Sequence, residues 1–375
     1  MVIIIQPKER DHRNISRLEV EYGNGKFETP TRSVTKNDIN AKSRLGADTP
    51  LTEQRRVFVC QEHINSNIAF DVLNTNGFLG EFIAKQLAFL DRVKGTKAMT
   101  AMYPRITDEL LRSMSSDSSL RNGISHFILQ LMSELKSDVY FLQSEMLGEA
   151  EMRILQNQST PFVPIFDIHH IQLIKDRLQE FIDMSSDMVP FIGFTHASYI
   201  HANLAFDYIM LNLESIHEQS KGIVSVDAWR SLGKSGTDVS GPHYSSFLIS
   251  DIVAEEYHGR IVPDEDSPLI PRVFEKSDLA IPPIMAGHNV AEHEDELAYF
   301  GDDQGLKDLF LRTLSYNNSE KDIKRNRPSY MSRLHEGLVS AKEYENMRAV
   351  IISHELKNYR ESKYKMNQLL INQKL

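Results

Sequence analysis

The chain has 375 residues, of which 41% are hydrophobic and 25% charged, so it has the composition of an ordinary globular protein with room for one large domain and an appendage. Its formal net charge of −10 excludes a globally basic nucleic-acid binder. The single cysteine, Cys60, excludes an internal disulfide and CxxC metal knuckles, and it favours a reducing, cytoplasmic setting.

Membrane insertion and secretion are not expected from this sequence. No apolar run approaches the roughly 18 residues that a membrane helix needs. The apolar stretch at the start, within MVIIIQPKER, is too short for a secretory signal. We therefore expect no membrane partner.

The first segment, residues 1–26, predicts an entry hairpin. Leu18–Tyr22 alternates like a strand, and Gly23-Asn-Gly25 is a hairpin-turn signal. The region that follows predicts strands at 31–35 and 55–60. Residues 69–93 contain apolar side chains at helical spacing, which predicts an amphipathic helix.

The middle of the chain alternates between strand and helix signals. Further strands are predicted at 98–103, 139–142, 162–166, 189–194, 209–213, 223–226 and 248–253. Strands alternating with helices indicate a parallel sheet, and a count near eight favours a closed barrel. We predict an α/β fold, a (β/α)8 TIM-type barrel over residues 27–262; an open doubly wound sheet is the alternative.

After Pro263 the composition changes. Residues 263–375 predict an irregular, proline-containing segment followed by a C-terminal helical appendage. Residues 320–375 hold 12 Lys and Arg against 7 Asp and Glu, which permits a basic contact surface on an acidic body. The nucleic-acid-binding residues that we predict there are Lys321, Lys324, Arg325, Arg327 and Arg333.

Several predicted strands finish in a polar residue: Asp167, His196, Glu214, Asp227 and, within its strand, Asp251. Carboxylates near the C-terminal ends of barrel strands are typically catalytic. Two carboxylates in one pocket can divide labour, one as an ionised nucleophile and the other as an acid, base or acceptor. We expect Asp167 and Asp251 to open to the same end of the barrel.

A metal site is a weaker interpretation. The adjacent pair His169-His170 would point to opposite faces of an extended segment, and no His-x-His pair is present. We predict no metal and no cofactor, but a metal-dependent barrel hydrolase that uses Asp167, His169, His196 and Asp251 stays open as an alternative.

Four short motifs resemble the tRNA-guanine transglycosylase superfamily. Phe27-Glu-Thr-Pro30 follows a glycine turn as in that family's opening, and Gly233 and Gly236 precede Ser250-Asp251 as its glycine loop precedes the nucleophilic aspartate. Phe166-Asp167 is similar to its base-recognising segment, and His354-Glu-Leu to its closing helix. The chain departs from the family in lacking the zinc cysteines and the Asp-Ser-Gly-Gly motif, so it resembles a remote member.

The resemblance implies a glycosyltransferase that exchanges guanine in DNA or tRNA for a 7-deazaguanine base, with Asp251 as the covalent nucleophile and Asp167 recognising the base. No basic RNA-binding domain is appended, which favours DNA. A non-catalytic nucleic-acid-binding relative is a further alternative, and a homodimer is left open. The substrate-binding residues expected are Phe166, His196, Gly233, Gly236, Tyr257, His258 and Arg260.

Overall fold

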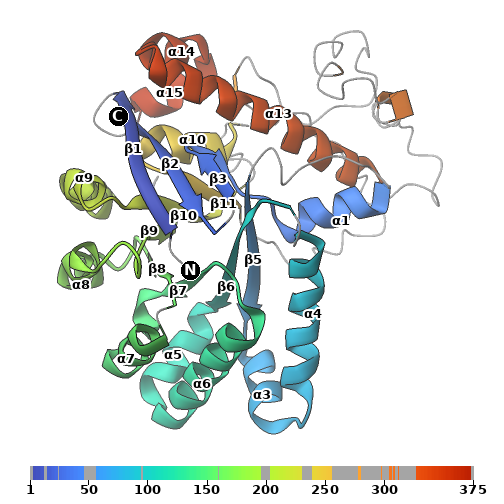
Figure 1. Cartoon of the computed structure of the whole chain (residues 1–375), viewed down its shortest axis with the longest axis vertical. Coiled ribbons are helices and arrows are strands. Elements are labelled where there is room, and N and C mark those ends of the chain that lie inside the picture. Colours follow the sequence, from blue (N-terminus) through green and yellow to red (C-terminus); the bar gives the residue numbers. More distant parts are fainter. Residues whose placement is uncertain are drawn as a thin grey trace.

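A computed structural model describes residues 3–11, 15–23, 25–45, 56–93, 96–158, 160–195, 203–229, 239–255, 278–279, 297, 304–305, 307–308, 311 and 327–372. Its centre is an eight-stranded sheet in the order β4-β11-β10-β9-β8-β7-β6-β5, in which every pairing is parallel (Figure 1). Its strands are β4 (Thr31–Arg32), β5 (Val57–Ile64), β6 (Met99–Ile106), β7 (Val139–Gln143), β8 (Phe162–Phe166), β9 (Phe191–Thr195), β10 (Gly222–Ala228) and β11 (Ile252–Glu255).

The sheet closes between its first and last strands. Val34, just after β4, donates its amide hydrogen to Val57 O at 2.7 Å and accepts from Val59 N at 3.0 Å. These two bonds join the segment just after β4 to β5, and β4 and β5 are the strands at the two ends of the sheet order. The predicted (β/α)8 TIM-type barrel with C-terminal helices is therefore confirmed.

Helices alternate with the barrel strands and cover their outer side (Figure 1). They are α1 (Lys36–Leu45), α3 (Ser66–Asn74), α4 (Phe78–Val93), α5 (Asp108–Ser116), α6 (Ser118–Leu135), the 3-10 turn η1 (Ser144–Met146), α7 (Glu149–Gln158), α8 (Ile171–Asp183), α9 (Asn203–Glu218) and α10 (Gly241–Leu248). On β5, Val57 and Val59 belong to the cluster inside the barrel, whereas Phe58 and Cys60 pack in the layer beneath the helices. This alternation follows from the two-residue period of a strand.

Two predicted strands are wrong in their type or position. Residues 209–213 lie in the middle of α9, where Glu214 is exposed. The run 248–253 is split, because α10 ends at Leu248 and β11 begins only at Ile252. Asp251 therefore precedes the last strand and does not lie within it.

The N-terminal segment forms a three-stranded antiparallel sheet, with strands β1 (Ile3–Asp11), β2 (Ile15–Tyr22) and β3 (Gly25–Glu28). Its apolar side chains, including Leu18, Val20 and Phe27, join the same cluster as the barrel interior. Tyr22 Oη donates a hydrogen bond to Lys97 O, just before β6. The sheet thus covers the end of the barrel where the strands begin, which leaves the opposite end for a site.

The C-terminal helices are α13 (Arg327–Ile352), α14 (Leu356–Ser362) and α15 (Tyr364–Asn372), and α13 packs on α1, β1 and β4 (Figure 1). A buried ion network attaches α13 to the barrel wall. Arg32 Nη1 lies 2.6 Å from Glu336 Oε1, and the Arg32 guanidinium also pairs with Glu255. Arg333 pairs with Asp38 at 3.2 Å and with Glu255 at 3.0 Å.

Candidate functional site

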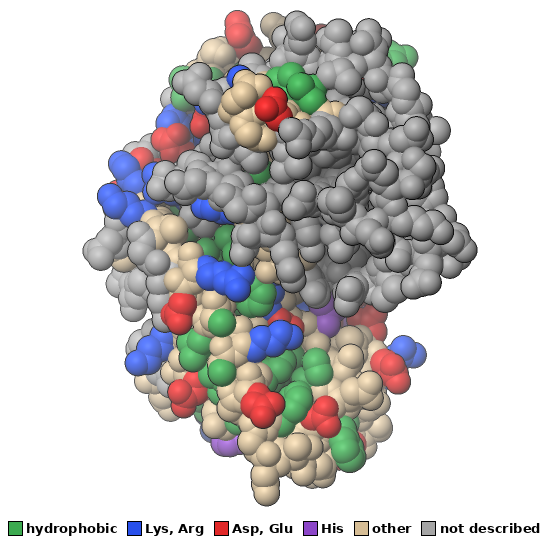
Figure 2. Space-filling view, turned by 90° about the vertical axis from the view of Figure 1, so that its right-hand side faces the viewer, with side chains coloured by type: hydrophobic (Ala, Val, Ile, Leu, Met, Phe, Trp, Pro, Cys, Tyr) green, Lys and Arg blue, Asp and Glu red, His purple; other side chains and the backbone are tan. Residues whose placement is uncertain are grey.

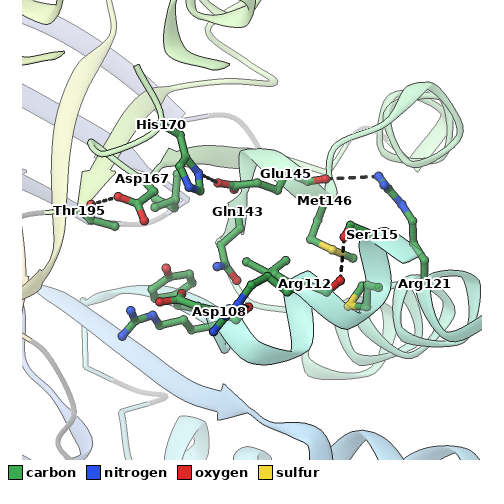
Figure 3. Close-up of a pocket in the computed structure, with 15 residues that line it drawn as sticks. Asp108, Arg112, Ser115, Arg121, Gln143, Glu145, Met146, Asp167, His170 and Thr195 are labelled. Carbon is green, nitrogen blue, oxygen red and sulfur yellow. Dashed lines mark hydrogen bonds and ion pairs between the residues drawn. The ribbon is translucent and has the colours of Figure 1, made fainter. Parts of the chain in front are cut away.

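A cavity of about 500 Å³ opens where β6 to β9 end. One wall is formed by side chains from these strands and the segments just after them, and the other by α5, α6 and η1 (Figure 3). Its lining is Tyr103, Arg105, Asp108, Leu111, Arg112, Met114, Ser115, Arg121, Gln143, Glu145, Met146, Ile165, Asp167, His170 and Thr195. This volume is within the range of roughly 300–1,000 Å³ that is usual for small-molecule sites.

Asp167 lies at one end of the cavity, one residue after β8. Its Oδ1 accepts hydrogen bonds from the backbone amide of His169 at 2.9 Å and from Thr195 Oγ1 at 3.4 Å. The Thr195 hydroxyl oxygen in turn accepts from Ile168 N at 3.2 Å. Among the residues that the structure describes, none bonds to Asp167 Oδ2, so that oxygen is available to a ligand in the cavity.

Asp227 lies at the end of β10, where the pairing with β11 becomes irregular. Val224 and Val226 face the barrel interior, so regular alternation would turn Asp227 outward. Its positive φ of 58° turns the carboxylate inward instead, which is an uncommon conformation for a residue with a side chain. Gln61 Nε2 donates to Asp227 Oδ1 at 2.8 Å, and Arg105 Nε lies 3.2 Å from Oδ2.

The charges of both aspartates, Asp167 and Asp227, act on the phenol group of Tyr103. Its side chain is fully buried, although it contributes to the cavity lining. Burial, and then the negative charge of Asp227, raise the pKa of Tyr103 well above its ordinary value, and Asp167 adds to the effect. Tyr103 therefore remains a neutral phenol that can donate a hydrogen bond at any physiological pH.

Gln143, at the end of β7, holds the end of β6 in place. Its Oε1 accepts from Ile106 N at 2.6 Å and its Nε2 donates to Ile106 O at 3.1 Å. Such a two-point clamp fixes the backbone next to Arg105. The guanidinium of Arg105 is thereby positioned between the cavity and Asp227.

Glu145 and His170 form the ionisable pair of the cavity. His170 Nδ1 lies 2.9 Å from Glu145 Oε1 (Figure 3). This hydrogen bond raises the pKa of His170 above its ordinary value, while partial burial opposes the shift and the charge of Asp167 supports it. His170 therefore binds its proton more tightly than a free imidazole does.

Asp251 lies at the opposite end of the barrel from Asp167, so the prediction of a shared pocket is wrong. It precedes β11, whereas Asp167 follows β8, and all neighbouring strands are parallel. Its carboxylate is 3% exposed; Oδ2 accepts from Ile223 N at 2.7 Å, and Oδ1 accepts from Thr29 Oγ1 at 3.3 Å. These bonds link the segments that lead into β4 and β11 to the start of β10, which is a structural role.

Two other predicted site residues do not reach the cavity. Phe166 is fully buried outside the barrel interior, with its ring 5.8 Å from that of Phe181 and 6.0 Å from that of Phe194. Arg333, on α13, is held in the ion network between that helix and the barrel wall, so it is not a phosphate contact. Of Arg327 the structure gives only the place at the start of α13.

The remaining predicted residues lie outside the described ranges: His196, Gly233, Gly236, Tyr257, His258, Arg260, Lys321, Lys324 and Arg325. On the face shown in Figure 2, basic, acidic and hydrophobic side chains are interspersed wherever the structure describes them. That face shows no continuous basic surface within the described part.

The described residues contain no group of three or more His, Cys, Asp or Glu side chains arranged to hold a metal ion. Likewise, none of the helices described has the length and apolar character needed to span a membrane. No protein-family model and no curated protein matches the chain.

Sequence reasoning found Asp167 and noted Asp227 as a strand-end carboxylate, but it missed most of the cavity lining. Tyr103, Arg105 and Gln143 carry the same signal as Asp167, because each lies at the end of a predicted strand. Arg112 and Arg121 carry no such signal, because they lie on helices.

Proposed function

We propose that the protein exchanges guanine in a polynucleotide, DNA or tRNA, for a 7-deazaguanine base through a covalent bond between the sugar and a carboxylate. The observation that carries the proposal is that Asp167 lines the cavity and that Asp227, buried at the same end of the barrel, pairs with Arg105, which also lines the cavity. Asp167 follows β8 and Asp227 lies near the end of β10, two places away in the sheet, which is a backbone separation of roughly 10 Å. A nucleoside can bridge such a span, with its base at one carboxylate and its sugar at the other.

Asp167 suits recognition of the base. An ionised carboxylate only accepts hydrogen bonds, and the Watson–Crick edge of guanine presents the N1 and N2 donors. Thr195 and the His169 amide hold one carboxylate oxygen, which orients the other toward the cavity. Tyr103 and Ile165 supply an aromatic edge and an apolar surface beside it.

Asp227 replaces Asp251 as the proposed nucleophile. A carboxylate oxygen of Asp227 attacks the sugar carbon C1′, and the electron pair of the C1′–N9 bond leaves with guanine, which takes up one proton. The incoming base loses one proton and displaces the carboxylate again. Gln61 donates to one oxygen of Asp227 and Arg105 pairs with the other, and Arg105 must move from Oδ2 before the sugar carbon can approach.

His170 is the group in the cavity best suited to handle that proton. Its pKa is raised by Glu145, so a larger fraction is protonated near neutral pH than for a free imidazole. It gives a proton to the leaving base and recovers one from the incoming base. The reaction therefore needs no external acid or base.

The test is the incorporation of labelled guanine into DNA and into tRNA by the purified chain. We expect incorporation by the wild type, loss of it in Asp227→Asn, and retention in Asp187→Asn. Asp187 is the matched control, because it is exposed and lies before β9, at the other end of the barrel. No incorporation by the folded wild type into either polymer refutes the proposal and leaves the non-catalytic binding protein as the better account.

A further inference from the structure

The side chain of Arg105 lies between the cavity and Asp227. It comes from β6 and lines the cavity, and its Nε lies 3.2 Å from Oδ2 of Asp227, a residue near the end of β10 that is not part of the described lining. Strands β6 and β10 are four places apart in the eight-stranded sheet, so this contact reaches across the barrel mouth. A ligand in the cavity therefore meets the guanidinium of Arg105 before it meets the carboxylate of Asp227.

The side chain of Arg105 can turn while its backbone stays fixed. This side chain is 22% exposed, whereas that of Asp227 is 3% exposed. Gln143 clamps the backbone of Ile106, the next residue, at both its N–H and its carbonyl group. When Arg105 turns away, Gln61 Nε2 still donates to Asp227 Oδ1 at 2.8 Å, so Oδ1 stays in place and Oδ2 becomes the reacting oxygen.

A guanidinium that leaves a buried carboxylate needs another anion nearby, because a buried charge is strongly destabilising once its partner is removed. Guanosine offers no anion, whereas a nucleotide carries a phosphate next to its sugar. The planar fork of an arginine matches phosphate oxygens in a bidentate manner. The lining also contains the carboxylates of Glu145 and Asp108, but Glu145 hydrogen-bonds to His170 and Asp108 is exposed to solvent.

We propose that Arg105 moves from Asp227 to the phosphate that flanks the sugar of the target nucleotide, and so opens Asp227 only to a phosphorylated substrate. The place of the sugar, at Asp227, rests on the proposed function, whereas the phosphate contact is tested by binding alone. The phosphate then lies at the sugar end of the ligand, and the base lies at the other end against Asp167. Arg105 thereby selects a nucleotide within a polynucleotide over a free nucleoside.

The experiment measures the affinities of guanosine and of guanosine 3′- and 5′-monophosphate for the full chain by calorimetry. In the wild type we expect one monophosphate to bind at least about threefold more tightly than guanosine, a modest ratio because the phosphate contact replaces the contact with Asp227. In Asp227→Asn, Arg105 no longer has to leave a carboxylate at this position. The ratio should therefore increase about tenfold, which corresponds to about 1.4 kcal/mol. An ion pair that only supports the fold gives no such increase.

Variants of Arg105 separate this contact from a general effect of charge. Arg105→Gln should bring the ratio close to one and leave the guanosine affinity unchanged, and Arg105→Lys should recover part of the ratio, because the charge remains without the fork. The double variant Arg105→Gln/Asp227→Asn leaves neither charge of the pair buried alone, so it carries the test if Arg105→Gln does not fold. Its ratio should also be close to one. A ratio that stays high in the double variant shows that removing a negative charge is enough to favour anions, and it overturns the proposal.

The matched control is Arg153→Gln on α7, where the side chain is 77% exposed and does not line the cavity. It should keep the wild-type ratio.

Three other results also overturn the role of Arg105. These are equal affinities of the wild type for guanosine and both monophosphates, a ratio that does not increase in Asp227→Asn, and the failure of all three ligands to bind a folded wild type. The proposed function fails separately: the expected ratios without base exchange keep the phosphate contact and remove the transglycosylase. Base exchange with equal affinities keeps the transglycosylase and removes the phosphate contact.

Discussion

Replacing Asp251 should lower stability without affecting the chemistry at the barrel mouth. Asp251 is almost fully buried and accepts from Ile223 N and Thr29 Oγ1 at the end of the barrel covered by β1–β3. Asp251→Ala removes both bonds and leaves the Ile223 amide without this acceptor. At about 1.5–3 kcal/mol for the short bond to the charged group and about 1 kcal/mol for the longer one, the expected loss is roughly 2.5–4 kcal/mol.

The assay is urea denaturation followed by circular dichroism, with Asp251→Asn as the comparison. The asparagine oxygen can still accept from Ile223 N, and the amide can donate to Thr29 Oγ1, so we expect a smaller loss of roughly 1–2 kcal/mol. Nucleotide binding and base exchange should persist in both variants at temperatures where they are folded. An Asp251→Ala protein that unfolds like the wild type, or that is folded and cannot exchange bases while binding nucleotide, would refute this reasoning.

Three further results are expected. The rate of base exchange should fall as pH rises through the pKa of His170, which lies above the ordinary 6.5, because the proton needed by the leaving base is then lost. Glu145→Gln removes the hydrogen bond that contributes most to this shift, so the midpoint of the pH–rate profile should move to lower pH; an unchanged midpoint assigns the proton to another group. Arg333→Met should lower the free energy of unfolding by roughly 3–5 kcal/mol, because it leaves Asp38 and Glu255 buried without that cation. Since Arg333 is not a phosphate contact, the salt dependence of nucleic-acid binding should stay as in the wild type. Gln143→Leu should weaken base exchange more than it weakens guanosine binding, since the clamp on Ile106 positions Arg105 and not the base; equal losses in both would show that Gln143 contacts the base.

The sequence by itself determined the barrel fold and the end of the barrel at which Asp167 lies. Strands rich in β-branched and aromatic residues, such as Phe162–Phe166 and Phe191–Thr195, alternate with amphipathic helices, and that rhythm admits few arrangements other than a parallel sheet. A polar residue directly after such a strand must lie at its C-terminal end. Asp167 was therefore placed correctly from local information.

Short apolar runs did not determine their own secondary structure. Phe247–Val253 and Ile209–Leu213 are each compatible with a buried helix or a buried strand, because periodicity cannot separate the two over so few residues. The tertiary structure ends α10 at Leu248 and begins β11 at Ile252. That difference of a few residues moves Asp251 from the mouth of the barrel to its opposite end.

The arrangement of side chains at this end of the barrel was decided only by barrel closure and one backbone irregularity. Asp227 faces inward because of its left-handed conformation, against the alternation that its neighbours follow. Arg112 and Arg121 reach the same cavity as Asp167 because α5, α6 and the end of β8 come together around the mouth. Contacts between residues so distant in the chain depend on how the strands pair and how the helices pack, and no local pattern of side chains encodes them.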